Sequence, residues 1–398
     1  MEKGILLIMD GLGDLGNKKG KTPLSASKKK NLDRMAREGL LGMLSPLGRG
    51  NVPGSDTSHL TLLGYPYWEY YCGRGPLEAL GSGIKLMKGD VAFRTNFATV
   101  KKGEIVDRRA GRITTSLGKK LEKKIKKINV NGAEVIFRST VEHRGVLILR
   151  GNGLGAHVSG TDPHAHVPVP KSRALKKGSE KTARILNEFT KKAMDVLGKV
   201  EANRGRKLPA NAVLCRGAGA YRKIEPFAKH HGFNGACVAG GALYRGVAEY
   251  IGMDVLHVEG ATGTADTDLK AKAKHAVAAL KNHDFVFVHV KATDNCSHDR
   301  DAKCKQKIIE KVDRELVPVL KKTGANIMVT GDHTTACCTG KHTGHEVPLL
   351  CWGPGFRKDS MKKFDEFYCM EGGLGHIDGR DLFPVMVNAM GKGKKIGS

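Results

Sequence analysis

Three short apolar runs, each followed closely by acidic or histidine residues, restrict the possible folds of this chain more than any other feature. The runs and the residues that follow them are 5–9 with Asp10, 285–290 with Asp294, and 326–330 with Asp332 and His333. Apolar runs of this length without polar alternation are typical of strands buried on both faces of a parallel sheet. Helical spacing of apolar residues occurs beside them, in residues 269–281 and 302–322. The pattern predicts a doubly wound α/β domain.

The residues that follow the runs predict one shared site. In a doubly wound sheet, ligands bind beyond the carboxyl ends of the strands, which is where Asp10, Asp294 and Asp332 fall. Asp294 and His298 are four residues apart, so both side chains lie on one face of a helical turn. An isolated Asp or His at the end of a loop more often makes a turn or caps a helix. Together, these carboxylates and imidazoles are typical ligands of Zn²⁺, Mn²⁺ or Mg²⁺.

A serine follows a Pro-Gly turn just before an expected helix, in residues 51–59. One interpretation of Ser55 is an N-cap, a common role for serine at this position. The other is a phosphate nucleophile, because metal ions lower the pKa of a nearby hydroxyl and a helix N-terminus stabilises phosphoryl oxygens. The local pattern does not choose between them.

The length of 398 residues suggests two or three domains. Between about residues 88 and 226 the pattern changes, because short strand-like runs alternate with lysine-rich helices, and residues 151–171 form a long irregular stretch. The buried-strand pattern resumes at residues 235–240. We therefore predict a smaller inserted α/β (α+β) domain at 88–226 within a discontinuous domain made of 1–87 and 227–398.

The chain is strongly basic, with 67 Lys and Arg against 40 Asp and Glu, a formal net charge of +27. Such a charge attracts polyanions in general. In residues 117–128 the apolar residues have helical spacing and lysines cover the other face. No interleaved aromatic residues or zinc-finger spacing accompany them, so a solvated helix face is favoured over a dedicated nucleic-acid surface. Nucleic-acid binding is therefore expected to be non-specific only.

No apolar stretch approaches the 18 residues of a membrane span, and the apolar run that ends before Asp10 has only five residues. We predict a cytoplasmic protein with no membrane partner. The nine cysteines are odd in number and lack C-x-x-C spacing, which favours reduced thiols over a disulfide framework.

Several longer motifs, taken together, resemble one known family. They include residues 9–14, 20–24, 31–33, 53–59, 73–80, 93–100 and 107–112. In this order they closely resemble the archaeal-type cofactor-independent (2,3-bisphosphoglycerate-independent) phosphoglycerate mutases of the alkaline phosphatase superfamily. Matching segments continue through residues 159–164, 240–246 and 260–263 to the Asp and His residues described above, so the resemblance covers nearly the whole chain.

The resemblance implies an alkaline-phosphatase-like sheet domain and an isomerase of glycolysis and gluconeogenesis that interconverts 3-phosphoglycerate and 2-phosphoglycerate. It implies that Ser55 is transiently phosphorylated and that two divalent ions are bound, usually Mn²⁺, with Mg²⁺, Co²⁺ or Zn²⁺ as alternatives. The implied ligands are Asp10, Ser55, Asp332 and His333 for one ion, and Asp294, His298 and His342 for the other.

The insert is expected to hold the substrate. The carboxylate and phosphate of the substrate are best bound by side chains that donate two hydrogen bonds and carry a positive charge, and arginine has both properties. The candidates in family-like segments are Arg94, Arg109 and Arg112, with Asp162 and His164 as acid/base groups. Two alternatives remain open: a metal-dependent phosphomonoesterase of the same superfamily, and a polyanion- or RNA-binding protein that kept only the fold. The oligomeric state is not predicted.

Overall fold

The computed structural model describes residues 2–397, which divide into two compact units. The first unit comprises residues 2–71 and 224–397, and the second comprises Cys72–Lys223. The second unit thus begins before the predicted insert, because helix α5 (Arg74–Gly81) packs on its strands. Gly75 makes this approach possible, since a Cβ at that position would collide with the carbonyl oxygen of Ala92.

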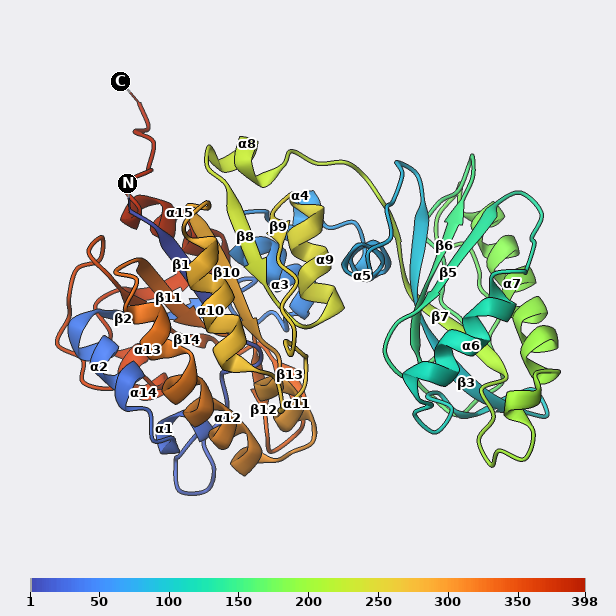
Figure 1. The fold of residues 1–398 in the computed structure, drawn as a ribbon, viewed down its shortest axis with the longest axis horizontal. Helices are drawn as coiled ribbons and strands as arrows, with labels where there is room; N and C mark the ends of the chain where they lie inside the picture. Colours follow the sequence, from blue (N-terminus) through green and yellow to red (C-terminus); the bar gives the residue numbers. More distant parts are fainter. Residues whose placement is uncertain (1, 398) are drawn as a thin grey trace. The chain divides into compact units, whose positions relative to one another are not determined.

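The first unit is built on an eight-stranded sheet (Figure 1). In spatial order its strands are β15 (Gly375–Asp378), β2 (Leu40–Ser45), β14 (Val347–Trp352), β11 (Asn326–Thr330), β1 (Gly4–Met9), β10 (Phe285–Val290), β8 (Gly235–Val238) and β9 (Asp254–Val255). β1 is central and pairs in parallel with β10 and β11, and all three strands are buried. The predicted α/β class and its three buried parallel strands are confirmed.

The sheet is mixed, which was not predicted. β14 runs antiparallel to both β11 and β2. The connection from β11 to β14 contains only the small hairpin of β12 (Thr334–Ala336) and β13 (Lys341–Thr343), with no helix. A parallel return usually runs through a crossover helix, and because this connection has none, the chain comes back antiparallel.

Helices cover both faces of this sheet. Those of the first unit are α1 (Pro23–Ala26), α2 (Lys30–Glu38), α3 (Ser55–Leu62), α4 (Tyr67–Tyr70), α8 (Phe227–His231), α9 (Ala242–Tyr250), α10 (Leu269–Ala279), α11 (Ala292–His298), α12 (Ala302–Glu315), α13 (Val317–Lys321), α14 (Glu366–Met370) and α15 (Gly379–Ala389). α10, α12 and α13 pack against one another (Figure 1). Their buried residues share one apolar core with alternate residues of β1, including Ile5 and Leu7. Another group of helices is formed by α3, which contacts both α9 and α15. α9 also contacts β8, and α15 also contacts β2 and β11. The single helix predicted at 302–322 is two helices, because Pro318 interrupts it and lies in the first turn of the second one, where proline is tolerated.

The second unit is an antiparallel sheet covered by helices, which is an α+β arrangement. Its strands are β4 (Glu104–Asp107), β3 (Val91–Lys101), β6 (Arg144–Arg150), β5 (Glu134–Ser139) and β7 (Ala212–Ala220), with β7 paired to β3. Its helices are α5, α6 (Thr115–Ile125), α7 (Glu180–Gly198) and the short 3₁₀ helix η1 (Glu201–Asn203). Leu121 and Ile125 of the basic helix α6 are buried, while its lysines are exposed, as the helical spacing predicted.

One expectation about the cysteines was wrong. A disulfide joins Cys296 in α11 to Cys304 in α12, while the other seven cysteines are free thiols. The turn between the two helices brings Cα atoms eight residues apart in sequence to 5.5 Å, a proximity that spacing alone does not reveal. Across residues 2–397, no helix is long and apolar enough to cross a membrane.

Candidate metal centre and arginine cluster

The carboxyl ends of three neighbouring strands bring the predicted acidic residues together in the first unit. Asp10 directly follows β1, Asp294 lies in α11 after β10, and Asp332 lies two residues beyond β11. The three side chains are buried. Three groups of potential metal ligands result. We name Asp10, Asp332 and His333 the first triad, and Asp294, His298 and His342 the second triad. The third group, Asp10, His59 and His289, shares Asp10 with the first triad.

In the first triad, both carboxylates face the same imidazole nitrogen. His333 Nε2 lies 3.2 Å from Asp332 Oδ2 and 3.6 Å from Asp10 Oδ1. The same nitrogen is 3.1 Å from the Oγ atom of Ser55. Asp332 Oδ1 accepts a hydrogen bond from the Gly11 amide, whereas the buried Oδ2 atom accepts none. An unsatisfied buried carboxylate oxygen beside an imidazole nitrogen fits a cation site.

In the second triad, Asp294 lies between two imidazoles. His298 Nε2 is 3.3 Å from Asp294 Oδ2, and His342 Nε2 is 3.6 Å from Asp294 Oδ1. The two Nε2 atoms are 3.3 Å apart. This juxtaposition of two nitrogens and a carboxylate suits a shared cation.

The Nδ1 partners of the three histidines support the same assignment. His298 Nδ1 lies 2.8 Å from the carbonyl oxygen of Gly340, and His342 Nδ1 lies 2.8 Å from that of Pro53. His333 Nδ1 lies 2.9 Å from the hydroxyl of Thr335. A proton on Nδ1 satisfies each contact and leaves the Nε2 lone pair facing the carboxylates, which is the usual arrangement of metal-binding histidines. The residues therefore fit a pair of divalent ions.

The local field keeps the aspartates ionised. Burial raises the pKa of Asp332, but the neighbouring His333, His59 and Lys291 more than offset this and hold the pKa far below its ordinary value. Burial also raises the pKa of Asp294, and Lys291 reverses that effect, so the net pKa lies well below the ordinary value. Three charged carboxylates in a buried site call for cations.

The sequence analysis missed four residues around the triads. His289 Nε2 lies 2.9 Å from Asp10 Oδ2, which fits a hydrogen bond that orients this carboxylate. His59 Nδ1 contacts the carbonyl oxygen of Ser55 at 2.6 Å. The Thr335 hydroxyl donates to Asp294 Oδ1 and so links the two triads. Lys291 contacts Asp10 and Asp294. His289 and Lys291 could have been identified from the sequence, because each lies next to the last residue of an expected strand, where site residues are common.

Ser55 is the first residue of α3, and the N-cap is Gly54. No side-chain hydrogen bond caps this helix, so the capping role considered for Ser55 is not observed. Its hydroxyl instead faces His333 of the first triad. The first backbone amides of α3 lie next to Ser55, and because they have no partner within the helix they can donate hydrogen bonds to anionic oxygens.

A buried ion pair supports the loop that follows β1. The Nζ atom of Lys305 in α12 donates to Asp14 Oδ2 at 2.8 Å and to the carbonyl oxygens of Gly13 and Thr335 at 3.0 and 3.1 Å. Both side chains are almost completely buried. Lys305 therefore ties the loop after Asp10 to the strand after His333.

Removing this lysine is expected to destabilise the first unit. Lys305→Met leaves the Asp14 carboxylate buried without its cation, which costs about 3–5 kcal/mol of unfolding free energy. Urea unfolding followed by circular dichroism measures the change. Lys307→Met, at an exposed position of the same helix, should change stability by less than about 0.5 kcal/mol. Equal stability of the two variants would contradict the structural role of Lys305.

Glu366 makes stability depend on pH. Its Oε2 atom accepts a hydrogen bond from the Thr22 hydroxyl and its Oε1 atom one from the Asp14 amide. Burial raises the pKa of Glu366 from 4.5 to about 7, so the folded chain binds this proton more tightly than the unfolded chain. The resulting stabilisation is complete below about pH 4.5 and is lost as pH rises through 7.

Glu366→Gln should therefore flatten the decline of unfolding free energy between pH 5 and 8, because glutamine does not ionise. Urea unfolding at each pH measures the slope. Glu371→Gln, at an exposed position, should retain the wild-type slope. The same slope in all three proteins would show that Glu366 does not titrate in this range.

The second unit holds a group of arginines with too few acids to neutralise them. We name Arg74, Arg94, Arg108, Arg144 and Arg216 the arginine cluster. Glu78 pairs with Arg74 at 3.2 Å and lies 3.7 Å from Arg94, and Asp162 accepts two hydrogen bonds from Arg108. Burial, with further arginines nearby, lowers the pKa of Arg94 to about 9 despite Glu78. The buried Nε atoms of Arg94 and Arg216 make no hydrogen bond, and each faces one acid: Arg94 Nε lies 3.7 Å from Glu78 Oε1, and Arg216 Nε lies 3.4 Å from Asp162 Oδ2. Two acids for five arginines leave positive charge that suits an anionic ligand.

The other residues predicted in the insert lie at the margin of this cluster. Arg109 and Arg112 are exposed. Burial and the nearby charge of Arg144 lower the pKa of His143 to about 4, and the charges of Arg109 and Arg112 act in the same direction. His164 Nε2 is 2.7 Å from a terminal nitrogen of Arg216. Arg112 and His164 have φ angles of 53° and 60°, strained values that are common at functional sites. Asp162 is ion-paired, and Arg108, which sequence reasoning missed, is its main partner.

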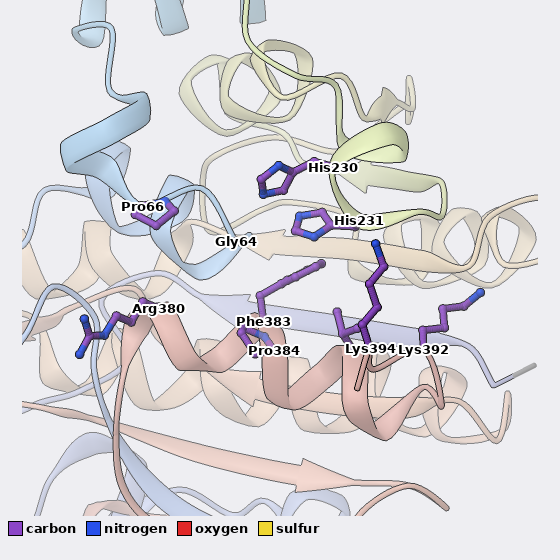
Figure 2. A pocket seen from close by; sticks show the side chains of 10 residues that line it. Gly64, Pro66, His230, His231, Arg380, Phe383, Pro384, Lys392 and Lys394 are labelled. Carbon is purple, nitrogen blue, oxygen red and sulfur yellow. The ribbon is translucent and has the colours of Figure 1, made fainter. Parts of the chain in front are cut away.

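A separate pocket of about 330 Å³ lies elsewhere on the first unit. Figure 2 shows its lining, which includes His230, His231, Phe383, Arg380 and Lys392. It includes no member of either triad and no acidic residue. The triads, rather than this pocket, define the candidate site.

Fold and site together define an α/β protein with paired Asp/His clusters and a serine at a helix N-terminus. The family described as 2,3-bisphosphoglycerate-independent phosphoglycerate mutase matches residues 36–203. The chain is 42% identical to the mutase 1 of this description from Methanocaldococcus jannaschii, over the full length of both. It is 44% identical to the one from Thermococcus kodakarensis, over 100% of this chain and 99% of the relative.

Two solved structures extend the comparison. The PH0037 protein from Pyrococcus horikoshii superposes with a TM-score of 0.88 at 38% identity, covering 100% of this chain and 99% of that one. The cofactor-independent phosphoglycerate mutase from Thermoplasma acidophilum gives a TM-score of 0.71 at 33% identity, covering 98% and 100%. The chain belongs to the archaeal-type 2,3-bisphosphoglycerate-independent phosphoglycerate mutases.

Proposed function

We propose that this mutase interconverts 3-phosphoglycerate and 2-phosphoglycerate through a phosphoserine at Ser55. One observation carries the proposal: Ser55 is the first residue of α3, and its hydroxyl lies 3.1 Å from His333 Nε2 in the first triad. Asp10, Ser55, Asp332 and His333 would hold one divalent ion, and Asp294, His298 and His342 would hold the other. When bound, the ions lower the pKa of the serine hydroxyl and stabilise charge on the phosphoryl oxygens. Mn²⁺ is the proposed ion.

The proposed reaction has two transfers. Ser55 Oγ attacks phosphorus, the bond to the 3-oxygen of glycerate breaks, and the proton lost by serine is balanced by protonation of that oxygen. Glycerate then turns, its 2-hydroxyl attacks the phosphoserine, and Ser55 recovers a proton. The backbone amides at the start of α3 stabilise the phosphoryl oxygens in both steps.

The arginine cluster supports transfer of the phosphoryl group from Ser55 to glycerate over hydrolysis of the phosphoserine by water. The excess positive charge of the cluster would hold the carboxylate of glycerate, with Arg109 and Arg112 added from the neighbouring turn. His164 is the better acid/base candidate, because Asp162 is held ionised by Arg108 despite its burial. We also expect the enzyme to act in the cytoplasm and to bind nucleic acid only non-specifically, through its net charge of +27.

An enolase-coupled assay on EDTA-treated protein tests the proposal. Activity should be lost on EDTA treatment and restored by Mn²⁺, with Mg²⁺, Co²⁺ and Zn²⁺ compared at the same concentration. Release of inorganic phosphate without 2-phosphoglycerate would identify a phosphomonoesterase instead. Full activity without any added metal, in protein shown to be metal-free by elemental analysis, would refute the two-metal mechanism.

A further inference from the structure

Lys291 connects the two triads. Its Nζ atom lies 2.9 Å from Asp10 Oδ1 in the first triad and 2.6 Å from Asp294 Oδ2 in the second. The residue directly follows β10 and stands at the N-cap position of α11. Its ammonium also lies 5.6 Å from the ring centre of Tyr244. The contacts come from three separate elements, so the position of this charge is well defined.

The partners of Lys291 are the groups expected to bind metal ions. Asp10 and Asp294 each belong to a triad, and Asp332 acts on the same ammonium through its charge. A divalent ion that enters either triad must therefore bind beside a fixed positive charge. In a buried site this repulsion is only weakly screened.

We propose that Lys291 is a positioning residue that weakens the binding of divalent ions and strengthens the binding of the phosphate group. The proposal rests on the two-metal site of the proposed function. The three aspartates and Lys291 together carry a net charge of minus two, and two divalent ions change this to plus two. A phosphate dianion then neutralises the site. Without the lysine charge, the same complex would retain one negative charge.

The charge count predicts opposite effects on two ligands. Lys291→Met should tighten Mn²⁺ binding to EDTA-treated protein by about tenfold or more, because a nearby positive charge is removed. With Mn²⁺ saturating, the same variant should bind inorganic phosphate about tenfold more weakly. Isothermal titration calorimetry measures both affinities. Lys291→Arg keeps the charge and should retain both wild-type values to within about threefold.

A matched control separates the local charge from the overall field. Lys270→Met removes one charge from an exposed position on α10 and should alter neither affinity. If Lys291→Met does not fold without metal, thermal unfolding against Mn²⁺ concentration replaces the titration, and the Mn²⁺-dependent rise in Tm should exceed that of the wild type.

Each contrary result has a distinct meaning. Unchanged or weaker Mn²⁺ binding in Lys291→Met would overturn the proposal, since it would show that the lysine organises the ligands instead of opposing the ions. Unchanged phosphate affinity would overturn its second half. A wild-type protein that binds none of Mn²⁺, Mg²⁺, Co²⁺ or Zn²⁺ would refute the metal site of the proposed function itself.

Discussion

Ser55→Ala is expected to abolish mutase activity, with a loss of at least about 1,000-fold, because no other hydroxyl would be available to carry the phosphoryl group. The fold should be unaffected, since the change removes only one hydroxyl from the first turn of α3. The enolase-coupled assay measures turnover, and circular dichroism checks the fold. Phosphatase activity should be lost together with mutase activity.

Ser58→Ala is the matched control for this variant. Ser58 lies on the same helix and its buried hydroxyl has no hydrogen-bond partner, so the substitution should preserve activity. Acid-stable radiolabel from phosphoglycerate should appear in the wild type and in Ser58→Ala but not in Ser55→Ala. Turnover by Ser55→Ala above a tenth of the wild-type rate would refute the phosphoserine mechanism.

Replacing Arg109 and Arg112 together by alanine is expected to lower mutase turnover by about 100-fold or more, because two charge-assisted contacts to the substrate would be lost. Ser55 should still accept the phosphoryl group. Glycerate would then leave before it turns, since its effective concentration at the phosphoserine falls, and water would resolve the intermediate. The share of turnovers that end in inorganic phosphate should rise.

The measurement is the ratio of 2-phosphoglycerate to inorganic phosphate formed from 3-phosphoglycerate with saturating Mn²⁺. Arg184→Ala, at an exposed position of α7 in the same unit, should leave both the rate and the ratio unchanged. An unchanged ratio in the double variant would show that its two arginines are ordinary surface residues. The half-buried Arg94 and Arg216 would then be the next candidates for the clamp.

The strands and their terminal aspartates were predictable because the signals are local. An uninterrupted apolar run identifies a doubly buried strand, and parallel strands end at one edge of a sheet. The juxtaposition of Asp10, Asp294 and Asp332 follows from these two rules. The direction of β14 was not predictable, because its apolar sequence resembles that of the parallel strands and only the connection determines its orientation.

The arginine cluster shows the opposite case. The sequence identifies many arginines in the second unit, but strand register places Arg94 of β3 opposite Arg216 of β7. Register depends on pairing between segments that are far apart in the chain. Arg109 and Arg112 were chosen from motif resemblance, and the structure places them on the exposed margin, with Arg108 bound to Asp162.

The sequence by itself determined the α/β class, the family, and the acidic edge of the sheet, because periodicity and motifs depend on residues that are close together in the chain. Only the tertiary structure decided which charges meet. Lys291 joins Asp10 to Asp294, and Lys305 holds Asp14, across separate elements. The physical reason is that electrostatic energy depends on distances of a few ångströms, which are set by packing and register and not by spacing along the sequence.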